Sequence, residues 1–229
     1  AGAAGSAEGL VRIRLGTKTI LSLADGHAER PVEGFVRNAS DDQVRQVLGA
    51  AGLPTDKVRI TFTAALLEAD GQRILFDGGN GEFGAPTSGR LLASLAKAGV
   101  QPDQIDHVIV SHFHGDHING LRTRAGELTF PKARIHVPAV EWAFWMDEDR
   151  QASAPEAMKG AFGNVRRVFG PIGDKVHRFY SGSEVVPGVR SVAAFGHTPG
   201  HTIFTVEDGD RTWAYLADLT NIRSEERRV

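Results

Sequence analysis

The chain has 229 residues, no cysteine and a formal net charge of −2 at pH 7, with acidic and basic residues interspersed. This composition excludes disulfides, thiol catalysis and sulfur-rich zinc sites, and it provides no long basic stripe for nucleic-acid phosphates. No apolar stretch approaches the roughly 20 residues that cross a bilayer. We therefore expect a soluble protein without nucleic-acid or membrane partners, and either periplasm or cytoplasm remains open as its compartment.

The first residues predict a flexible segment followed by strands. Residues 1–9 have linker-like composition, and we place a single domain at 10–229. Residues 11–26 alternate apolar and polar side chains, which predicts a hairpin or two short strands that end in a turn at Asp25 and Gly26.

Helix and turn signals come next. Ser40 and Gln43 form the pattern of a capping box, and Gly52 is placed to end the helix that follows. Two β-rich runs joined by Asp70 and Gly71 predict a hairpin.

The remaining chain alternates helices with strands. Residues 87–100 predict a helix whose apolar stripe consists of Leu91, Leu92, Leu95 and Ala98. Helical character also covers 139–149 and continues to about residue 168. Further strands are predicted at 107–111, 133–138, 177–182, 189–196, 202–209 and 211–218. This mixture favours a layered α/β domain with mixed sheets.

Three histidines and an aspartate follow the strand at 107–111 in the sequence HFHGDH. His112 and His114 lie two positions apart, so on an extended loop their rings can face the same ion. Asp116 and His117 are adjacent, so they diverge and can bind a second ion. Because imidazole is costly to bury without a partner, the cluster predicts a metal site with nitrogen and oxygen ligands.

A second group of candidate ligands lies downstream, again after apolar strands. His197 and His201 occur in GHTPGHT, and Asp218 ends YLAD. Residues at the ends of several strands can converge on one edge of a sheet. We interpret His197 as a ligand, Asp218 as a bridging carboxylate, and His201 as a residue beside the ligands. The isolated histidines are interpreted as ordinary hydrogen-bonded residues: His27, His107, His136 and His177.

HFHGDH, GHTPGHT, Asp218 and the earlier ILFDGG together resemble the metallo-β-lactamase superfamily. The resemblance implies an αβ/βα sandwich of two mixed β-sheets flanked by helices. Within that superfamily, longer stretches at 83–121, 128–137 and 186–202 resemble the methyl parathion hydrolase group.

The resemblance also implies a role for each candidate. His112, His114 and His197 would bind the first metal, Asp116 and His117 the second, and Asp218 would bridge both, with Asp116 and Asp218 as the catalytic carboxylates. Asp77, in ILFDGG, would accept the ring N–H of a metal-bound histidine on the side opposite the metal. His201 would lie next to the ligands and support them without binding metal. The family supplies one more histidine from a later strand. Since the chain ends at Val229 without it, we expect a domain that lacks its C-terminal closing elements or has a gap near Ile222.

Two divalent ions at such a site would activate a bridging hydroxide. With nitrogen and oxygen ligands zinc is the expected metal, although manganese, iron or cobalt would fit similar geometry. The expected reaction is hydrolysis of a small, neutral ester, either an organophosphate triester or an aryl ester. In the parathion-hydrolase group, aromatic residues at the positions of Phe83, Trp145 and Phe162 line the leaving-group pocket.

Other interpretations stay open. No cluster of arginine or lysine in the sequence marks a site for a highly anionic substrate. A lactonase of the acyl-homoserine lactone type would use the same hydroxide, and a mononuclear iron dioxygenase of the same fold would use His112, His114 and Asp116. A non-catalytic binding module would bind no metal. A homodimer is suggested only by analogy with the resembled group.

Overall fold

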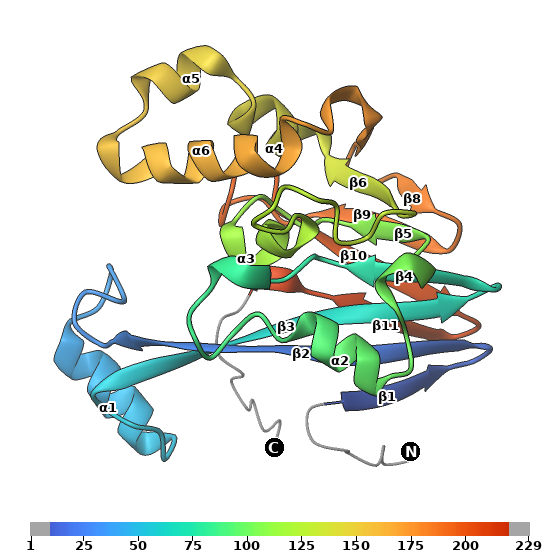
Figure 1. The fold of residues 1–229 in the computed structure, drawn as a ribbon. Coiled ribbons are helices and arrows are strands. Elements are labelled where there is room, and N and C mark those ends of the chain that lie inside the picture. Colours follow the sequence, from blue (N-terminus) through green and yellow to red (C-terminus); the bar gives the residue numbers. More distant parts are fainter. Residues whose placement is uncertain (1–9, 220–229) are drawn as a thin grey trace.

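In the computed structural model, which describes residues 10–219, two β-sheets pack face to face with helices outside them (Figure 1). The first sheet is mixed, because the pairs from β1 to β4 are antiparallel and those from β4 to β7 are parallel. Its strands are β1 (Leu10–Leu15), β2 (Lys18–Pro31), β3 (Lys57–Ala69), β4 (Gln72–Phe76), β5 (His107–Ile109), β6 (Arg134–Pro138) and β7 (His177–Phe179).

The second sheet is antiparallel throughout, in the order β11-β10-β9-β8. Its strands are β8 (Glu184–Val186), β9 (Val189–Ala193), β10 (Thr202–Asp208) and β11 (Arg211–Tyr215). The helices are α1 (Asp41–Ala50), α2 (Leu91–Lys97), α3 (Gly115–Ile118), α4 (Ala139–Trp145), α5 (Glu148–Ser153) and α6 (Glu156–Phe169). The architecture predicted from the sequence, two sheets flanked by helices, is confirmed.

The first sheet is buried on both faces because its strands carry consecutive apolar residues. On β3, Leu66 faces the core formed with α2, α4 and α6, whereas Leu67 faces the core between the sheets. Leu75 and Phe76 of β4 divide in the same way. Successive side chains of a strand point to opposite faces, so an uninterrupted apolar run is the pattern of a strand covered on both sides.

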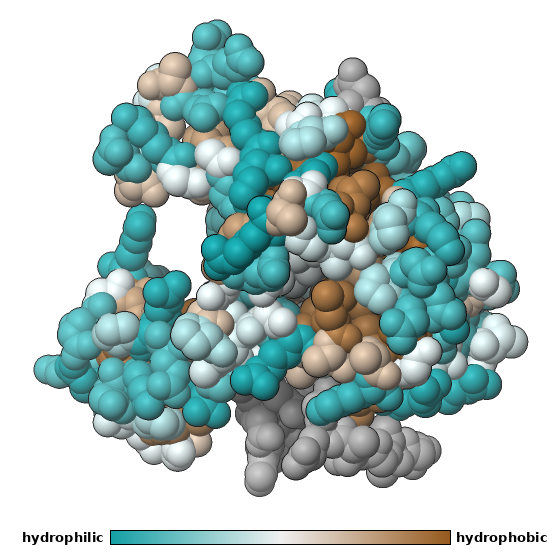
Figure 2. Space-filling model, viewed as in Figure 1, coloured by the Kyte–Doolittle hydropathy of each residue, from teal (hydrophilic) through white to brown (hydrophobic). Residues whose placement is uncertain are grey.

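The long β2–β3 pair extends beyond the rest of the sheet and carries α1 at its far end (Figure 1). A small separate core of Val32, Leu48 and Val58 joins the helix to the strands. The predicted capping box is present at Ser40 and Gln43. In the space-filling view this arm stands apart from α5 and α6, so a recess opens on that side of the molecule (Figure 2).

Several local predictions can be compared with the structure. Asp70 and Gly71 form the predicted hairpin turn, both with positive φ. The predicted turn at Asp25 and Gly26 is wrong: β2 continues through them with a bulge. A Cβ on Gly26 would lie 2.1 Å from the carbonyl oxygen of Thr87, so the bulge lets a neighbouring segment approach the strand.

Two further expectations need correction. Leu92 does not belong to the buried stripe of α2, since 46% of its surface is exposed while Leu91 and Leu95 are buried. The short strand β8 was not anticipated.

Residues 1–9 and 220–229 lie outside the described part of the chain. The predicted flexible N-terminal segment and the stretch after Asp218, with the proposed gap at Ile222, fall there, and the single-domain assignment stays a prediction. Within residues 10–219, no helix has both the length and the apolar character required to span a membrane.

Candidate metal centre

Strand ends bring the candidate residues together. β4 leads directly into Asp77, and β5, its parallel neighbour, leads into the segment that carries His112 to His117. His197 lies between β9 and β10, and Asp218 follows β11. Segments far apart in the sequence therefore meet at one place, as the sequence pattern predicted.

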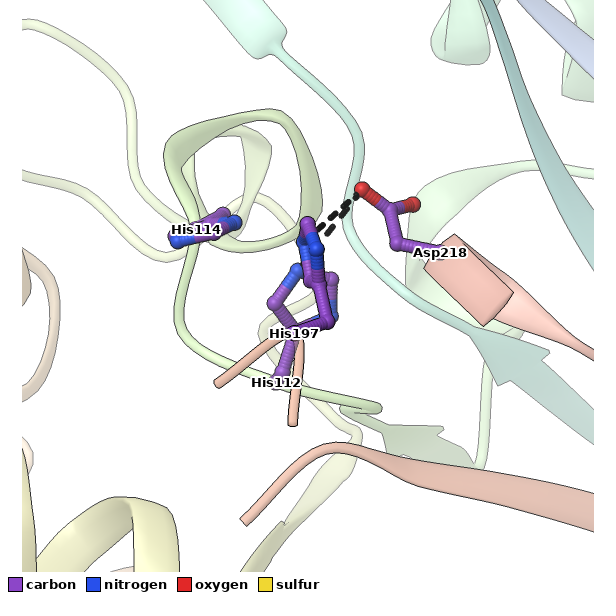
Figure 3. A group of neighbouring side chains, drawn as sticks. All are labelled: His112, His114, His197 and Asp218. Atoms are coloured by element: carbon purple, nitrogen blue, oxygen red, sulfur yellow. Dashed lines mark ion pairs between the residues drawn. The ribbon is translucent and has the colours of Figure 1, made fainter. Parts of the chain in front are cut away.

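His112, His114, His197 and Asp218 form one group whose potential ligand atoms all lie within 4.8 Å of one another. The rings of His112 and His197 point towards the carboxylate of Asp218 (Figure 3). Nε2 of His197 lies 3.1 Å from Oδ2 of Asp218, and Nε2 of His112 lies 4.0 Å from the same atom.

Asp116, His117 and Asp218 form a second, three-residue group whose potential ligand atoms also lie within 4.8 Å of one another. Nε2 of His117 lies 3.1 Å from Oδ1 of Asp218 and 3.3 Å from Oδ2 of Asp116. The two oxygens of Asp218 thus face different groups, which is the arrangement that a bridging carboxylate requires.

The arrangement fits divalent cations better than it fits a hydrogen-bonded cluster. Nε2 of His112 and Nε2 of His117 are buried and make no hydrogen bond with any described residue. Buried polar atoms are normally satisfied, so two orphaned imidazole nitrogens aimed at carboxylates indicate a missing partner that accepts lone pairs. Imidazole and carboxylate ligands suit zinc and the other divalent metals expected from the sequence.

The charge states of two histidines and two aspartates suit the same role. Burial lowers the pKa of His112 and of His114, so both rings are neutral near pH 7, the form that binds metals. Burial tends to raise the pKa of Asp218, but the nearby His117 and His197 outweigh it and hold that pKa well below the usual range. His117 outweighs burial in the same way and lowers the pKa of Asp116. Both carboxylates are therefore ionised.

Asp77 lies directly behind the histidines. Its Oδ2 accepts a hydrogen bond of 2.7 Å from Nδ1 of His117 and one of 2.8 Å from the hydroxyl of Ser111, whose oxygen lies 3.0 Å from Nδ1 of His112. Tyr215 donates its hydroxyl to the same oxygen. These contacts fix the ring orientation and leave each Nε2 free, which is what the proposed supporting role requires. Asp77 also has φ of 65°, a conformation that non-glycine residues rarely adopt.

His201 is fully buried beside the two groups. Its Nδ1 lies 3.0 Å from the carbonyl oxygen of Ala194, and its Nε2 accepts a 3.1 Å hydrogen bond from the backbone N–H of Asp218. Burial lowers the pKa of His201, in agreement with a neutral ring that donates at one nitrogen and accepts at the other. Both nitrogens are occupied, so His201 positions the backbone of Asp218.

Sequence reasoning missed Glu141, a fully buried carboxylate of α4. Its Oε2 accepts hydrogen bonds from the backbone N–H of Phe113 (2.8 Å) and from Nε1 of Trp145 (3.0 Å), and its Oε1 accepts one from the backbone N–H of Gly200 (2.6 Å). Glu141 therefore ties the segment of His112 and His114 to the loop of His197. The sequence feature that could have revealed Glu141 is a single acidic residue inside the otherwise apolar run AVEWAFW.

The three aromatic candidates occupy different surroundings. Trp145 and Phe162 are 3% and 1% exposed and belong to the core under α4 and α6, with ring centroids 4.8 Å apart. Phe83 instead lines an open pocket of about 400 Å³. A role of all three in substrate binding stays a prediction.

Two clusters of charged or titratable side chains were not expected. Arg122, Arg124 and Arg167 line the pocket of Phe83, a cluster that the sequence pattern did not reveal. Arg122 and Arg124 lie two positions apart, but Arg167 is distant in the sequence and meets them only in the fold.

The other cluster consists of His107, His136 and His177, on neighbouring strands β5, β6 and β7. Nδ1 of His107 lies 3.0 Å from Nε2 of His136, whose Nδ1 lies 3.1 Å from Nδ1 of His177. The interpretation of these residues as hydrogen-bonded histidines agrees with the structure, although they bond to one another. Burial, and then the neighbouring histidines, lowers the pKa of His136 to about 3.

Comparisons with known proteins place these features in context. A family model described as the metallo-beta-lactamase superfamily matches residues 63–228. AidC, a dizinc quorum-quenching lactonase solved in complex with a product, is 26% identical, with a TM-score of 0.86 over 93% of this chain and 75% of that chain. Hydrolase AbOPH has the same fold, with 22% identity and a TM-score of 0.83 over 93% of this chain and 74% of that one.

A curated relative, the probable metallo-hydrolase Rv2300c of Mycobacterium tuberculosis, is 29% identical over 139 residues, which cover 58% of this chain and 42% of the relative. The chain spans about two fifths of the length of the curated relatives that it matches.

Proposed function

The chain belongs to the metallo-β-lactamase superfamily, and from this premise we propose that it is a hydrolase that uses two divalent cations, zinc in the first place, to cleave a small neutral ester. The observation that carries the proposal is the position of Asp218 between two separate ligand groups. A mononuclear site would need only one of them, so the geometry favours two ions over the single iron of a dioxygenase.

The proposed ligands are those expected from the sequence. His112, His114 and His197 would hold one cation, Asp116 and His117 the other, and Asp218 both. Bound cations would supply a water of lowered pKa and an electrophile for the substrate oxygen.

The surrounding residues hold this set in place. Asp77 accepts the Nδ1 proton of His117 and so directs the Nε2 lone pair towards Asp116 and Asp218. His201 fixes the backbone of Asp218, and Glu141 fixes the distance between the segments that carry His112 and His197. The ring of His117 and the backbone segments that carry the other ligands are therefore positioned before substrate binds.

The cavity beside the centre supports a substrate without negative charge. It measures about 310 Å³ and lies between β3 residues such as Phe62 and Thr63 and the carboxylates of Asp116 and Asp218. None of the described residues that line it is Lys or Arg. Beyond the proposed metal ions, an anionic substrate would meet aspartates there and no cationic Lys or Arg side chain among the described residues.

Two classes of neutral ester remain as candidates, each with its own support. The likeness to AidC, a lactonase, favours a lactone. The long sequence stretches that resemble the methyl parathion hydrolase group favour an aryl ester or an organophosphate triester. In that case Phe83, Trp145 and Phe162 would need to contact the leaving group, and the burial of Trp145 and Phe162 makes the lactone the stronger candidate.

Metal content and a panel of three substrates test the proposal. We expect two zinc ions per chain and zinc-dependent hydrolysis of an N-acyl-homoserine lactone, tested beside a neutral aryl carboxylic ester and a neutral aryl phosphotriester. One iron per chain without hydrolysis would support an oxygenase instead, and a protein that binds no divalent metal would support a binding module.

A further inference from the structure

Three arginines meet around one aromatic ring outside the metal centre. Arg122 follows the 3-10 turn Asn119–Leu121, Arg124 lies two residues later, and Arg167 is on α6. The guanidinium carbon of Arg167 lies 3.7 Å from the centroid of Phe83, and that of Arg124 lies 4.9 Å from it. We call this the arginine pocket; its described lining residues are Phe83, Arg122, Thr123, Arg124, Gly126, Arg167 and Pro171.

None of the three guanidinium groups forms an ion pair with a carboxylate of the described chain. Arg122 is buried and donates from Nε to the carbonyl oxygen of Val168. Arg124 donates from Nη2 to the carbonyl oxygen of Glu82, while the Glu82 carboxylate accepts the backbone N–H of Arg124. The positive charges are therefore held by neutral acceptors.

Arg167 is the least satisfied of the three. It donates to the side-chain oxygens of Asn119 and Asn164, but its buried Nη1 has no acceptor among the described residues. Burial, and then the charges of Arg122 and Arg124, lowers its pKa, although a guanidinium stays protonated in any case. Like charges this close repel one another, and a buried donor without a partner is costly.

A bound oxyanion would offset the repulsion among the three positive charges. Guanidinium groups present paired N–H donors that match the oxygens of phosphate and carboxylate, and these charge-assisted bonds are stronger than neutral ones. The ring of Phe83 forms an apolar wall for an organic group attached to the anion.

We propose that the arginine pocket binds the phosphate or carboxylate group of a small molecule. The pocket shares no lining residue with the cavity beside the metal centre. That cavity carries aspartates, whereas the arginine pocket carries cations, so the two would select ligand groups of different charge. Binding here does not depend on which ester is cleaved at the metal centre.

Titration calorimetry of the zinc-loaded protein with inorganic phosphate, in a buffer free of other oxyanions, tests the proposal. We expect saturable binding that weakens about ten- to hundredfold in Arg167→Gln and in Arg124→Gln, the effect of losing one charge-assisted contact. Arg190→Gln is the matched control, because Arg190 is exposed on β9 of the other sheet. It should bind phosphate like the wild type.

Arg167 also holds Asn119 and Asn164, so Arg124→Gln, whose side chain is exposed, provides the test that does not alter those contacts. Titration with phenylphosphonate as a second probe distinguishes an organic molecule that carries an oxyanion from free phosphate as the ligand. Tighter binding than phosphate, reduced in Phe83→Leu, would identify an organic ligand, and equal binding of both probes would identify free phosphate. Equal phosphate affinity in the wild type and in both arginine variants would overturn the proposal. Phosphate would then bind at the zinc ions or bind non-specifically.

Discussion

Replacing Glu141 by glutamine should weaken both the fold and one of the two metal sites. The carboxylate is 0% exposed and accepts three N–H bonds, from Phe113, Trp145 and Gly200. A glutamine of the same shape can keep its oxygen on Phe113 and Trp145, but its NH₂ group then faces the N–H of Gly200. One buried donor is left without an acceptor and two bonds lose their charge.

The expected cost follows from these contacts. An unsatisfied buried donor costs about 1–3 kcal/mol, and bonds to charged acceptors exceed neutral ones by up to about 1 kcal/mol each. We therefore expect the free energy of unfolding to fall by about 2–4 kcal/mol. Space for a loop shift is small, since a Cβ on Gly200 would lie 2.7 Å from the backbone nitrogen of Glu141.

The loss of the link between the segments of His112 and His197 should also weaken metal binding. Removing a residue that orients ligands typically lowers metal affinity about 10–100-fold. The measurement is zinc affinity by chelator competition, with unfolding by urea measured on the same samples. Glu148→Gln is the control, because 89% of the Glu148 side chain is exposed. Unchanged zinc affinity in Glu141→Gln, with stability lowered as expected, would show that Glu141 supports the fold alone and would refute the positioning role.

Three further predictions concern Asp218 compared with His201, then Asp77, and then His136. Asp218→Ala should release zinc and abolish hydrolysis, whereas His201→Gln should leave zinc content largely intact; equal zinc loss in both, measured by atomic absorption, would show the assigned roles to be wrong. Asp77→Asn removes the negative charge and one of the two acceptor oxygens that serve Ser111 and His117, so it should lower zinc affinity about 10–100-fold. An affinity equal to the wild type would contradict that support. His136 has a pKa of about 3 in the folded chain against 6.5 when unfolded, so the unfolded state takes up a proton as pH falls below 6.5 and stability declines. Between pH 7 and pH 5 the free energy of unfolding, measured with urea, should fall by about 1–2 kcal/mol less in His136→Leu than in the wild type. An identical fall in both proteins would mean that His136 does not titrate in this way.

Local signals in the sequence predicted local structure well. The capping box at Ser40 and the turn at Asp70 and Gly71 depend on a few adjacent residues, and both are present as expected. The prediction failed at Asp25 and Gly26. Aspartate and glycine are common in turns, but here they form a β-bulge within β2. Its cause is a contact with Thr87, some sixty residues away, which no local pattern contains.

The candidate site was predictable to the extent that its residue types are rare in combination. Three histidines and an aspartate after one strand, with His197 and Asp218 after two others, indicated convergence, and the structure brings these residues together. Glu141 could not be predicted, because its role depends on which backbone N–H groups surround it after folding.

The arginine pocket could not be predicted for the same reason, because its residues come together only after folding. Arg122 and Arg167 lie far apart in the sequence and are joined by the packing of α6 on the turn before Arg122, so neither forms a charge pattern along the chain.

Diffraction from crystals of the zinc-loaded protein at the zinc absorption edge tests most directly whether residues of distant segments hold a pair of cations. Two anomalous peaks are expected, one beside His112, His114 and His197 and one beside Asp116 and His117, each about 2.0–2.2 Å from a different oxygen of Asp218. A single peak, or two peaks that Asp218 does not join, would contradict the dinuclear centre on which the proposed hydrolysis depends.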